Sequence, residues 1–241
     1  MDAVLEIRGL TKSYELGHLR APALRGVDLT IGRGEFTALV GPSGSGKTTL
    51  LNIAGCLDVP DEGRVILAGE EVQNLKSGRR AEIRGRSIGF VFQTFNLIPV
   101  LTAKENAEYP LILGGHYRRA DAQEKARLKK RPAELLTELG LAEYLNRRPN
   151  DMSGGQRQRV AIARALVTEP AVVLADEPTA NLDSSTGTEI MKLLKEMNER
   201  HGATFLFATH DPLVMSFCRR IVTLTDGRIS DDRTQAGDGG R

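Results

Sequence analysis

The feature that most constrains the fold of this chain is a glycine-rich run, GPSGSGKT, at residues 41–48. Residues 36–40 before it are apolar and predict a buried strand, and residues 49–54 after it predict the start of a helix. Glycines let the backbone turn sharply between the two, so that successive N–H groups and the helix N-terminus face one point. A strand, a tight loop and a helix in this order predict an α/β fold with a mostly parallel sheet.

The same run predicts a phosphate-binding loop, because it fits the pattern G-x-x-x-x-G-K-[ST] between a strand and a helix. In such a loop Lys47 reaches the β- and γ-phosphates of a nucleotide, and the Thr48 hydroxyl can ligate Mg²⁺. A glycine-rich turn without a ligand is the alternative, and the placing of Lys47 and Thr48 argues against it. Kinases, GTPases and motors share the pattern, so it predicts nucleotide binding and no particular reaction. The predicted nucleotide contacts are Gly41, Pro42, Ser43, Gly44, Ser45, Gly46, Lys47, Thr48 and Thr49.

A second apolar run, residues 172–175, ends in two acids, Asp176 and Glu177. In an open α/β sheet, the carboxyl end of a strand lies at the ligand-binding edge. Asp176 therefore suits Mg²⁺, directly or through water, and Glu177 can act on the attacking water as a general base or polariser. The alternative is two acids that merely end a strand in solvent, and the phosphate-binding loop makes that interpretation the weaker one.

Three further candidates carry a weak signal individually. Gln93 follows a predicted strand, and its amide oxygen could reach Mg²⁺ or the water, although a Gln there is more often a surface residue. His210 ends another strand and could contact the γ-phosphate, although a lone His is more often structural. Tyr14 could stack on adenine, and a core or rim position is the alternative.

The run SGGQ at residues 153–156 predicts a second anion-binding helix terminus, because a serine and two glycines open the helix predicted over 157–167. A single nucleotide needs only the first phosphate site. The second site therefore suggests the γ-phosphate of a nucleotide that a partner subunit holds. The candidate contacts are Ser153, Gly154, Gly155 and Gln156.

The rest of the chain is predicted to surround this core with strands and helices. Residues 4–31 predict short strands broken by polar turns, part of an antiparallel flap. From about 95 to 165 the chain is rich in helix formers and charge, and it predicts an inserted helical subdomain that is interrupted at Pro99, Pro110, Pro132 and Pro149. A basic run, residues 117–131, is interpreted as a solvated helix face rather than an interaction patch.

The C-terminal part predicts a closing hairpin, in which Asp226 and Gly227 supply the turn. Beyond it, residues 231–241 are rich in Gly, Asp and Thr and are expected to be a disordered tail. Residues 1–230 then form a single domain.

Composition and charge narrow the choice of partners. There are 33 Lys and Arg against 31 Asp and Glu, so the charge balance gives no reason to expect a nucleic-acid partner. Cys56 and Cys218 lack the spacing of a metal site or a disulfide framework, which fits a reducing compartment. No apolar run approaches the roughly 18 residues that span a bilayer, and the first ten residues lack the layout of a signal peptide. The chain is therefore expected to stay cytoplasmic and to act on a membrane only through a partner protein.

Taken together, the motifs resemble those of the ATP-binding-cassette (ABC) ATPase family, from Leu5 to about Ile229. Tyr14 resembles the A-loop aromatic residue, residues 41–48 resemble Walker A, and Gln93 resembles the Q-loop glutamine. Residues 152–156 resemble the signature, and residues 172–177 resemble Walker B with its catalytic glutamate. Residues 181–183 resemble the D-loop, and His210 resembles the switch histidine. The signature begins with Met152 where Leu is usual, and the D-loop has Asn181 where Ala is common. Neither departure removes a phosphate-binding or catalytic group.

The resemblance implies a P-loop NTPase core of mostly parallel sheet with an antiparallel β subdomain and an inserted α-helical subdomain. It implies ATP and Mg²⁺ as cofactors, catalysis by Lys47, Glu177 and His210, and Asp183 among the nucleotide contacts. The metal contacts are then Thr48, Gln93 and Asp176. Two copies would close head to tail around ATP.

Within the family, stretches such as ADEPTANLDSSTG are most similar to the lipoprotein-releasing (LolD-like), macrolide-efflux (MacB-like) and cell-division (FtsE-like) group. That likeness implies transmembrane permease partners of the FtsX, MacB or LolCE type, which would hold the chain on the cytoplasmic face of the inner membrane. The main alternative is a soluble, non-transport ABC-type ATPase. A P-loop kinase or GTPase would leave residues 153–156 unexplained, and Glu177 argues against a non-hydrolysing binder.

Overall fold

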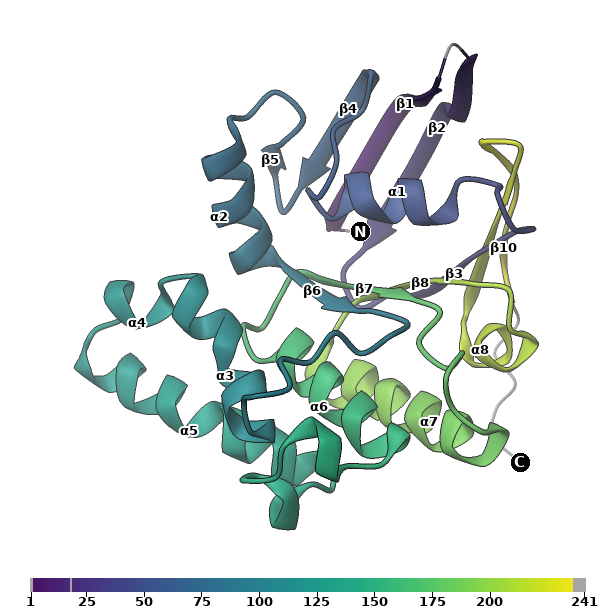
Figure 1. Ribbon diagram of the computed structural model, residues 1–241. Coiled ribbons are helices and arrows are strands. Elements are labelled where there is room, and N and C mark those ends of the chain that lie inside the picture. Colours follow the sequence, from purple (N-terminus) through teal and green to yellow (C-terminus); the bar gives the residue numbers. More distant parts are fainter. Residues whose placement is uncertain (1, 18, 236–241) are drawn as a thin grey trace.

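The computed structural model describes residues 2–17 and 19–235, which form a layered α/β structure (Figure 1). The strands are β1 (Ala3–Leu16), β2 (Leu19–Gly32), β3 (Phe36–Val40), β4 (Glu62–Leu67), β5 (Glu70–Glu71), β6 (Ile88–Val91), β7 (Val172–Asp176), β8 (Phe205–Thr209), β9 (Arg220–Thr225) and β10 (Arg228–Thr234). The helices are α1 (Lys47–Ala54), α2 (Ser77–Ser87), α3 (Ala103–Leu113), α4 (His116–Arg119), α5 (Ala122–Glu138), α6 (Gly154–Leu166), α7 (Ser184–His201) and α8 (Pro212–Phe217), with 3₁₀ turns η1 (Ala142–Tyr144) and η2 (Pro149–Asp151).

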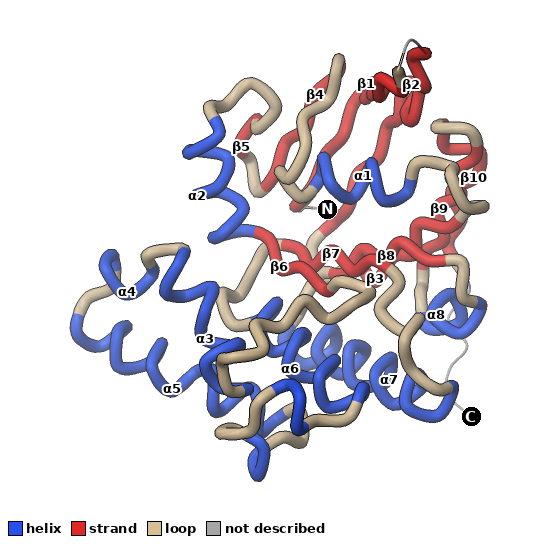
Figure 2. The backbone as a smooth tube through the Cα atoms, in the orientation of Figure 1, coloured by secondary structure: helices blue, strands red, loops and turns tan. Residues whose placement is uncertain are grey.

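The central layer is a sheet in the order β10-β9-β3-β8-β7-β6, in which β9, β3, β8, β7 and β6 run parallel and β10 is antiparallel to β9. Helix α1 and the antiparallel sheet lie on one side, and helices α3 and α5 to α8 lie on the other (Figure 2). The predicted α/β class with a mostly parallel sheet is therefore confirmed.

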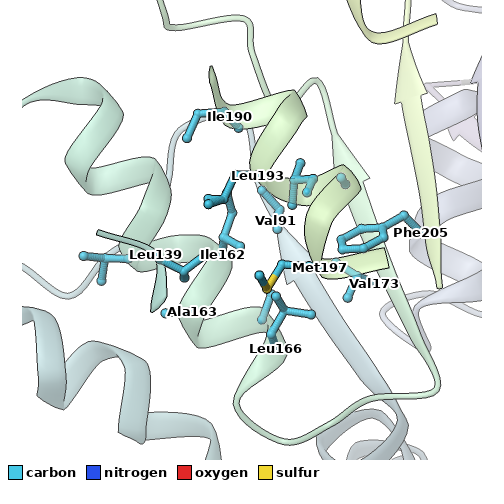
Figure 3. Packing of buried hydrophobic residues seen from close by; sticks show 14 of the residues in the cluster. Val91, Leu139, Ile162, Ala163, Leu166, Val173, Ile190, Leu193, Met197 and Phe205 are labelled. Carbon is cyan, nitrogen blue, oxygen red and sulfur yellow. The ribbon is translucent and has the colours of Figure 1, made fainter. Parts of the chain in front are cut away.

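Strands β3, β7 and β8 are mostly apolar, as expected for strands that are buried on both faces. Side chains alternate between two cores, as the period of two in a strand requires. Leu39 and Leu174 face the core shared with α1 and the antiparallel sheet. Val173 and Phe205 face the core shared with α6 and α7, together with Ile162 from α6 and Met197 from α7 (Figure 3).

The antiparallel sheet has the order β2-β1-β4-β5. Its first two strands are 14 residues each, where the sequence predicted several short strands broken by turns. The two strands form one long hairpin, and its register shifts at the positions where the sequence pattern is interrupted. Gly9 and Gly26 have positive φ within this hairpin. The polar breaks are therefore bulges, not strand ends.

Helices α3 to α6 occupy most of the stretch predicted to be helical. The prediction that Pro110 and Pro132 interrupt it is wrong, because they lie inside α3 and α5. Buried leucines on both sides of Pro132, Leu128 and Leu135, anchor α5 in the same core, and this packing outweighs the missing backbone hydrogen bond. The division of the chain into a core and a helical subdomain stays a prediction.

The C-terminal hairpin forms as predicted, with β10 antiparallel to β9. The expected disorder from Asp231 is wrong for residues 231–234, which continue β10. Asp232 accepts hydrogen bonds from Arg220 on β9 at 2.8 and 2.6 Å, and this pair fixes the end of the strand. Residues 236–241 of the predicted tail lie outside the described residues.

Among the described residues, no helix combines the length and the apolar character needed to cross a bilayer.

Candidate nucleotide site

The glycine-rich loop leads from β3 into α1, as its sequence predicts. Gly46 caps α1 in the left-handed region at φ 106°, and a Cβ there would lie 2.5 Å from the backbone oxygen of Ala23. No other residue fits this turn. Across the loop, Lys47 Nζ donates to the backbone oxygens of Gly41 at 2.8 Å and Pro42 at 3.0 Å. The loop thus forms a cradle with a cation over its rim, which suits phosphate.

Asp176 and Thr48 form the candidate metal position beside this cradle. Thr48 Oγ1 donates to Asp176 Oδ2 at 3.3 Å. Burial raises the pKa of Asp176, the Thr48 hydrogen bond opposes that rise, and the neighbouring Glu177 carboxylate adds to it. A divalent cation would relieve the cost of this half-buried charge.

The donor set fits Mg²⁺ bound together with a nucleotide. Hydroxyl and carboxylate oxygens are its preferred protein ligands, and it keeps waters and substrate phosphates for the remaining positions. Within the described part of the chain, no cluster of three or more His, Cys, Asp or Glu could hold a metal by itself. A cation at this position would take its remaining ligands from nucleotide phosphates and water.

Glu177 lies directly after β7 and is tied to the end of β8. Its Oε2 accepts a hydrogen bond from Thr209 Oγ1 at 2.9 Å, and its Oε1 lies 2.6 Å from His210 Nδ1. The Glu177 backbone is in the left-handed region at φ 46°, which is uncommon for a non-glycine residue. The Glu177 side chain is 14% exposed and that of His210 is 76% exposed. The structure therefore brings together the predicted catalytic carboxylate and the predicted histidine.

The SGGQ run opens α6 in a capping box. Ser153 is the N-cap, its Oγ accepts from the Gln156 N–H at 3.3 Å, and the Gln156 side chain accepts from the Ser153 N–H at 2.9 Å. The first turn of α6 carries no acidic residue, so the helix dipole there is not neutralised. This terminus is suited to an anion.

Asp183 lies beside that terminus, where it caps α7. It accepts hydrogen bonds from the hydroxyl of Ser185 and from the backbone and hydroxyl of Thr186, and these bonds hold the Asp183 pKa far below its usual range. A hollow of about 480 Å³ joins the two capping residues. It is lined by Ser153, Gly154, Gly155, Gln156, Arg157, Arg159, Asn181, Leu182, Asp183, Thr186 and Glu189.

Gln93 is exposed and lies two residues after β6, as predicted. Its backbone oxygen accepts a hydrogen bond from Asn181 Nδ2 at 2.7 Å. The loop that contains Gln93 therefore contacts the predicted D-loop.

Tyr14 lies on β1 and is 38% exposed. Its hydroxyl donates to Asp58 Oδ2 at 2.9 Å, and Lys12 Nζ lies 5.2 Å from the ring centre. Burial raises the pKa of Tyr14 above its ordinary value, and a hydrogen bond with the Thr49 side chain on α1 opposes only part of that rise. The ring is thus at the rim of the glycine-rich loop, and its contact with adenine stays a prediction.

Sequence reasoning missed the role of Thr209, whose hydroxyl is fully buried against Glu177. A usable signal was present, since a single polar residue ends an otherwise apolar strand, FLFAT, immediately before His210. It also missed Asp58 as the partner of Tyr14, for which the sequence carries no local signal.

The fold and the site define a P-loop ATPase of the cassette type, and comparisons with known proteins agree. The family model described as ABC transporter matches residues 24–180. The chain belongs to this family. It is the ATP-binding subunit of an ABC transporter, with ATP hydrolysis coupled to transport.

Relatives of known sequence and structure extend the match along the chain. The lipoprotein-releasing system ATP-binding protein LolD of Anaeromyxobacter dehalogenans is 50% identical, over 95% of this chain and 93% of that protein. The macrolide export ATP-binding/permease protein MacB of Syntrophobacter fumaroxidans is 46% identical over 98% of this chain, but this chain spans only 32% of MacB.

A solved cassette from Methanocaldococcus jannaschii, described as a dimeric post-hydrolysis state bound to ADP and Pi, has a TM-score of 0.85 and 47% identity. The match covers 97% of this chain and 99% of that one.

Proposed function

We propose that two copies of this chain associate head to tail and share two ATP sites. The observation that carries this proposal is the presence of two separate helix termini suited to an anion, at α1 and α6. Among the described residues, no hydrogen bond joins Ser153–Gln156 to the glycine-rich loop. Each ATP would lie between Lys47 and Thr48 of one copy and Ser153–Gln156 of the other. The dimeric cassette structure from Methanocaldococcus jannaschii supports this arrangement.

In the proposed reaction, water adds to the γ-phosphorus of ATP while the bond from that phosphorus to the β–γ bridging oxygen breaks. Glu177 accepts a proton from the water, Lys47 neutralises charge on the phosphates, and His210 contacts the γ-phosphate. Mg²⁺ held by Thr48, Asp176 and Gln93 would supply further neutralisation of phosphate charge. The products are ADP and phosphate.

Glu177→Gln tests this assignment. The amide keeps the shape of the side chain but cannot accept the proton, so kcat should fall about a hundredfold or more. ATP-dependent dimers should accumulate, because closure no longer leads to hydrolysis. Normal turnover in the variant would overturn the catalytic role of Glu177, and the absence of dimers with ATP would overturn the shared site.

We also propose that a groove between α2, α3 and β6 receives a helix of a membrane permease. The groove has a volume of about 450 Å³ and a mostly apolar lining. Leu57 and Leu113 line it and are 48% and 67% exposed. Two arginines, Arg84 and Arg164, also line it, and burial lowers the Arg164 pKa to about 10. An amphipathic helix with an acidic residue would match this lining.

The names of the relatives indicate the class of permease. MacB combines an ATP-binding and a permease part in one protein, and this chain spans only about a third of it. LolD is named for a lipoprotein-releasing system. We therefore infer that the partner of this chain is a permease that exports or extracts an envelope substrate. Binding to such a permease would place the chain on the cytoplasmic face of the membrane.

Leu113→Glu tests the groove, with Ile112→Glu as the matched control. Both leucine and isoleucine are exposed aliphatic residues of α3, but only Leu113 lines the groove. Membranes of the source cell, stripped of peripheral proteins, should rebind the wild-type chain and the Ile112→Glu chain but not the Leu113→Glu chain. Equal binding of all three would overturn the groove as the docking site. No saturable binding of any would favour a soluble ATPase.

A further inference from the structure

Asn181 connects two loops that lie 88 residues apart in the sequence. Its side-chain amide donates to the backbone oxygen of Gln93, with 2.7 Å between nitrogen and oxygen. Asn181 also lines the hollow that contains Ser153 and Asp183. One residue therefore contacts both the surface proposed to meet a second copy and the loop that follows β6.

Helix α6 holds the same loop from its other side. Arg164 donates to the backbone oxygen of Phe95 at 2.6 Å and to that of Asn96, and the Arg157 guanidinium lies 5.3 Å from the centre of the Phe95 ring. Phe95 and Asn96 are both in the left-handed region, with φ of 62° and 49°. Two consecutive non-glycine residues hold such a backbone only when their surroundings fix it. The loop is thus clamped between α6 and Asn181.

The two ends of α6 belong to different surfaces. Its N-cap, Ser153, lies in the hollow, and Arg164 near its C-terminus lines the groove proposed for the permease. A helix of 13 residues is about 20 Å long and moves as one body. The hollow and the groove are therefore connected through the helix and through the clamped loop, and the Asn181 amide joins that loop to residues 181–183.

We propose that Asn181 is a positioning residue that couples closure of the dimer to the shape of the permease groove. The proposal rests on the proposed function, since it takes a second copy at the hollow and a permease at the groove. When the second copy closes on residues 181–183, the hydrogen bond carries their displacement into the Gln93 backbone. Without this donor the two loops move independently. ATP still binds, but the site reaches its hydrolytic geometry less often.

Two substitutions remove the donor in different ways. Asn181→Asp is isosteric but presents only acceptors to the Gln93 oxygen, and Asn181→Ala removes the whole amide. We expect either change to lower kcat for ATP hydrolysis by about three- to tenfold, the worth of one hydrogen bond, with KM for ATP within about twofold. Asn74→Ala is the control, because Asn74 is an exposed asparagine in the loop between β5 and α2.

A spectroscopic reading separates coupling from a merely structural role. The chain contains no Trp, so Phe95→Trp places a single fluorophore in the clamped loop. Adding Mg²⁺ and ATP should shift its emission in the Phe95→Trp chain and in the same chain with Asn74→Ala. The shift should fall by at least about half when Asn181→Ala or Asn181→Asp is added, as expected when a single hydrogen bond carries the coupling.

An undiminished shift in both Asn181 variants, with kcat unchanged, would overturn the coupling. The Glu177→Gln chain keeps this failure distinct from failure of the proposed function. If that chain forms ATP-dependent dimers and the tryptophan response persists without the Asn181 amide, only the coupling is wrong. If no dimer forms, the shared site itself is wrong.

Discussion

The Glu177 carboxylate is held by the residues that end and follow β8. Thr209 is fully buried at the end of β8, and its hydroxyl both donates to Glu177 Oε2 at 2.9 Å and accepts from the Asp211 N–H at 3.0 Å. Because the hydroxyl is held on both sides, it fixes one orientation of the carboxylate. The other carboxylate oxygen, Glu177 Oε1, lies 2.6 Å from His210 Nδ1. The position of the proposed general base is therefore set by the end of a different strand.

Thr209→Val should separate this positioning from nucleotide binding. The valine keeps the shape but leaves Glu177 Oε2 and the Asp211 N–H without their partner, so we expect kcat to fall about tenfold and the free energy of unfolding to fall by about 1–3 kcal/mol. KM for ATP should stay within about twofold, because the Lys47 loop is untouched. Steady-state ATPase assays and chemical denaturation measure these effects. Thr209→Ser keeps the hydroxyl and should retain most of kcat. An equal loss in both variants would assign the effect to packing.

At the scale of residues, the sequence predicted the groups whose motif is local. Lys47 and Thr48 follow the glycines of one loop, and Asp176 and Glu177 end one strand, so their placing needs only the direction of the chain. The hydrogen bonds of Thr209 to Glu177 and of Asn181 to Gln93 join residues 32 and 88 positions apart. They depend on which strands become neighbours, and no periodicity in the sequence encodes that order.

Strand β6 and helix α6 approach each other so closely at Gly89 that no side chain fits between them. A Cβ at this position would overlap the backbone oxygen of Ala165 on α6. The requirement for glycine here comes from this close approach, since Gly89 does not have a positive φ. The contact also holds the helix whose first turn forms the proposed second phosphate site.

Gly89→Ala should therefore push α6 away from the sheet. Because the nearest neighbours of the new methyl group would be backbone atoms that cannot rotate away, we expect the free energy of unfolding to fall by about 2–3 kcal/mol. Gly78→Ala in α2 is the matched control, since no atom lies within 4 Å of the added Cβ. That change should be neutral or stabilise the chain by up to about 1 kcal/mol. Urea denaturation compares the two, and equal stabilities would contradict the close approach at Gly89.

At the scale of elements, strands with uniform environments were predicted within a residue or two. Residues 36–40 and 172–176 are buried on both faces, so their apolar runs have clear ends. The hairpin of β1 and β2 was fragmented in the prediction because its bulges break the alternation of side chains. Residues 231–234 were predicted to be disordered because the residues of β10 are mostly exposed and polar. The pairing of β10 with β9 comes instead from backbone hydrogen bonds and from the Arg220–Asp232 pair.

The Asp232 pair gives β10 a pH-dependent contribution to stability. Hydrogen bonds from Arg220 hold the pKa of Asp232 below its ordinary value of 3.8. A carboxyl group whose pKa is lower in the folded protein than in the unfolded chain stabilises the fold at pH values above its unfolded-state pKa. That stabilisation is lost as the pH falls through the folded-state pKa. Asp232→Asn should therefore lower the free energy of unfolding at neutral pH by about 0.5–1 kcal/mol, since the pair is partly exposed. The difference from wild type should shrink below pH 3.8. A difference that stays constant over this range would exclude the ion pair as its cause.

Across the whole molecule, one sheet edge collects residues from four parallel strands. Gly41 follows β3, Gln93 follows β6, Asp176 ends β7, and His210 follows β8. These strands are consecutive neighbours in the sheet, so their carboxyl ends meet. Ser153 is different, because it belongs to a helix terminus on the hollow beside Asp183. This division of motifs between an edge and a hollow is the reason we propose a site shared between two copies.

A shared site predicts that two inactive variants restore each other. Lys47→Ala removes the cation over the glycine-rich loop, and Gly154→Asp places a carboxylate where the γ-phosphate of the partner's ATP would lie. The aspartate has room, since the nearest atom to the added Cβ is 3.5 Å away, and an acid in the first turn favours the helix. Each variant alone should therefore fold but hydrolyse ATP poorly.

In a mixed dimer, one of the two sites combines the intact Lys47 loop of the Gly154→Asp chain with the intact Ser153–Gln156 terminus of the Lys47→Ala chain. Random association gives about half mixed dimers, each with one complete site, so an equal mixture should reach about a quarter of the wild-type ATPase rate per chain. The rate should rise more steeply than linearly with protein concentration at the low end, because activity requires association. Mixed dimers that form but stay inactive would contradict the expectation that one complete shared site in a dimer hydrolyses ATP. Substantial activity of the Gly154→Asp chain by itself would show that hydrolysis does not need the partner's terminus.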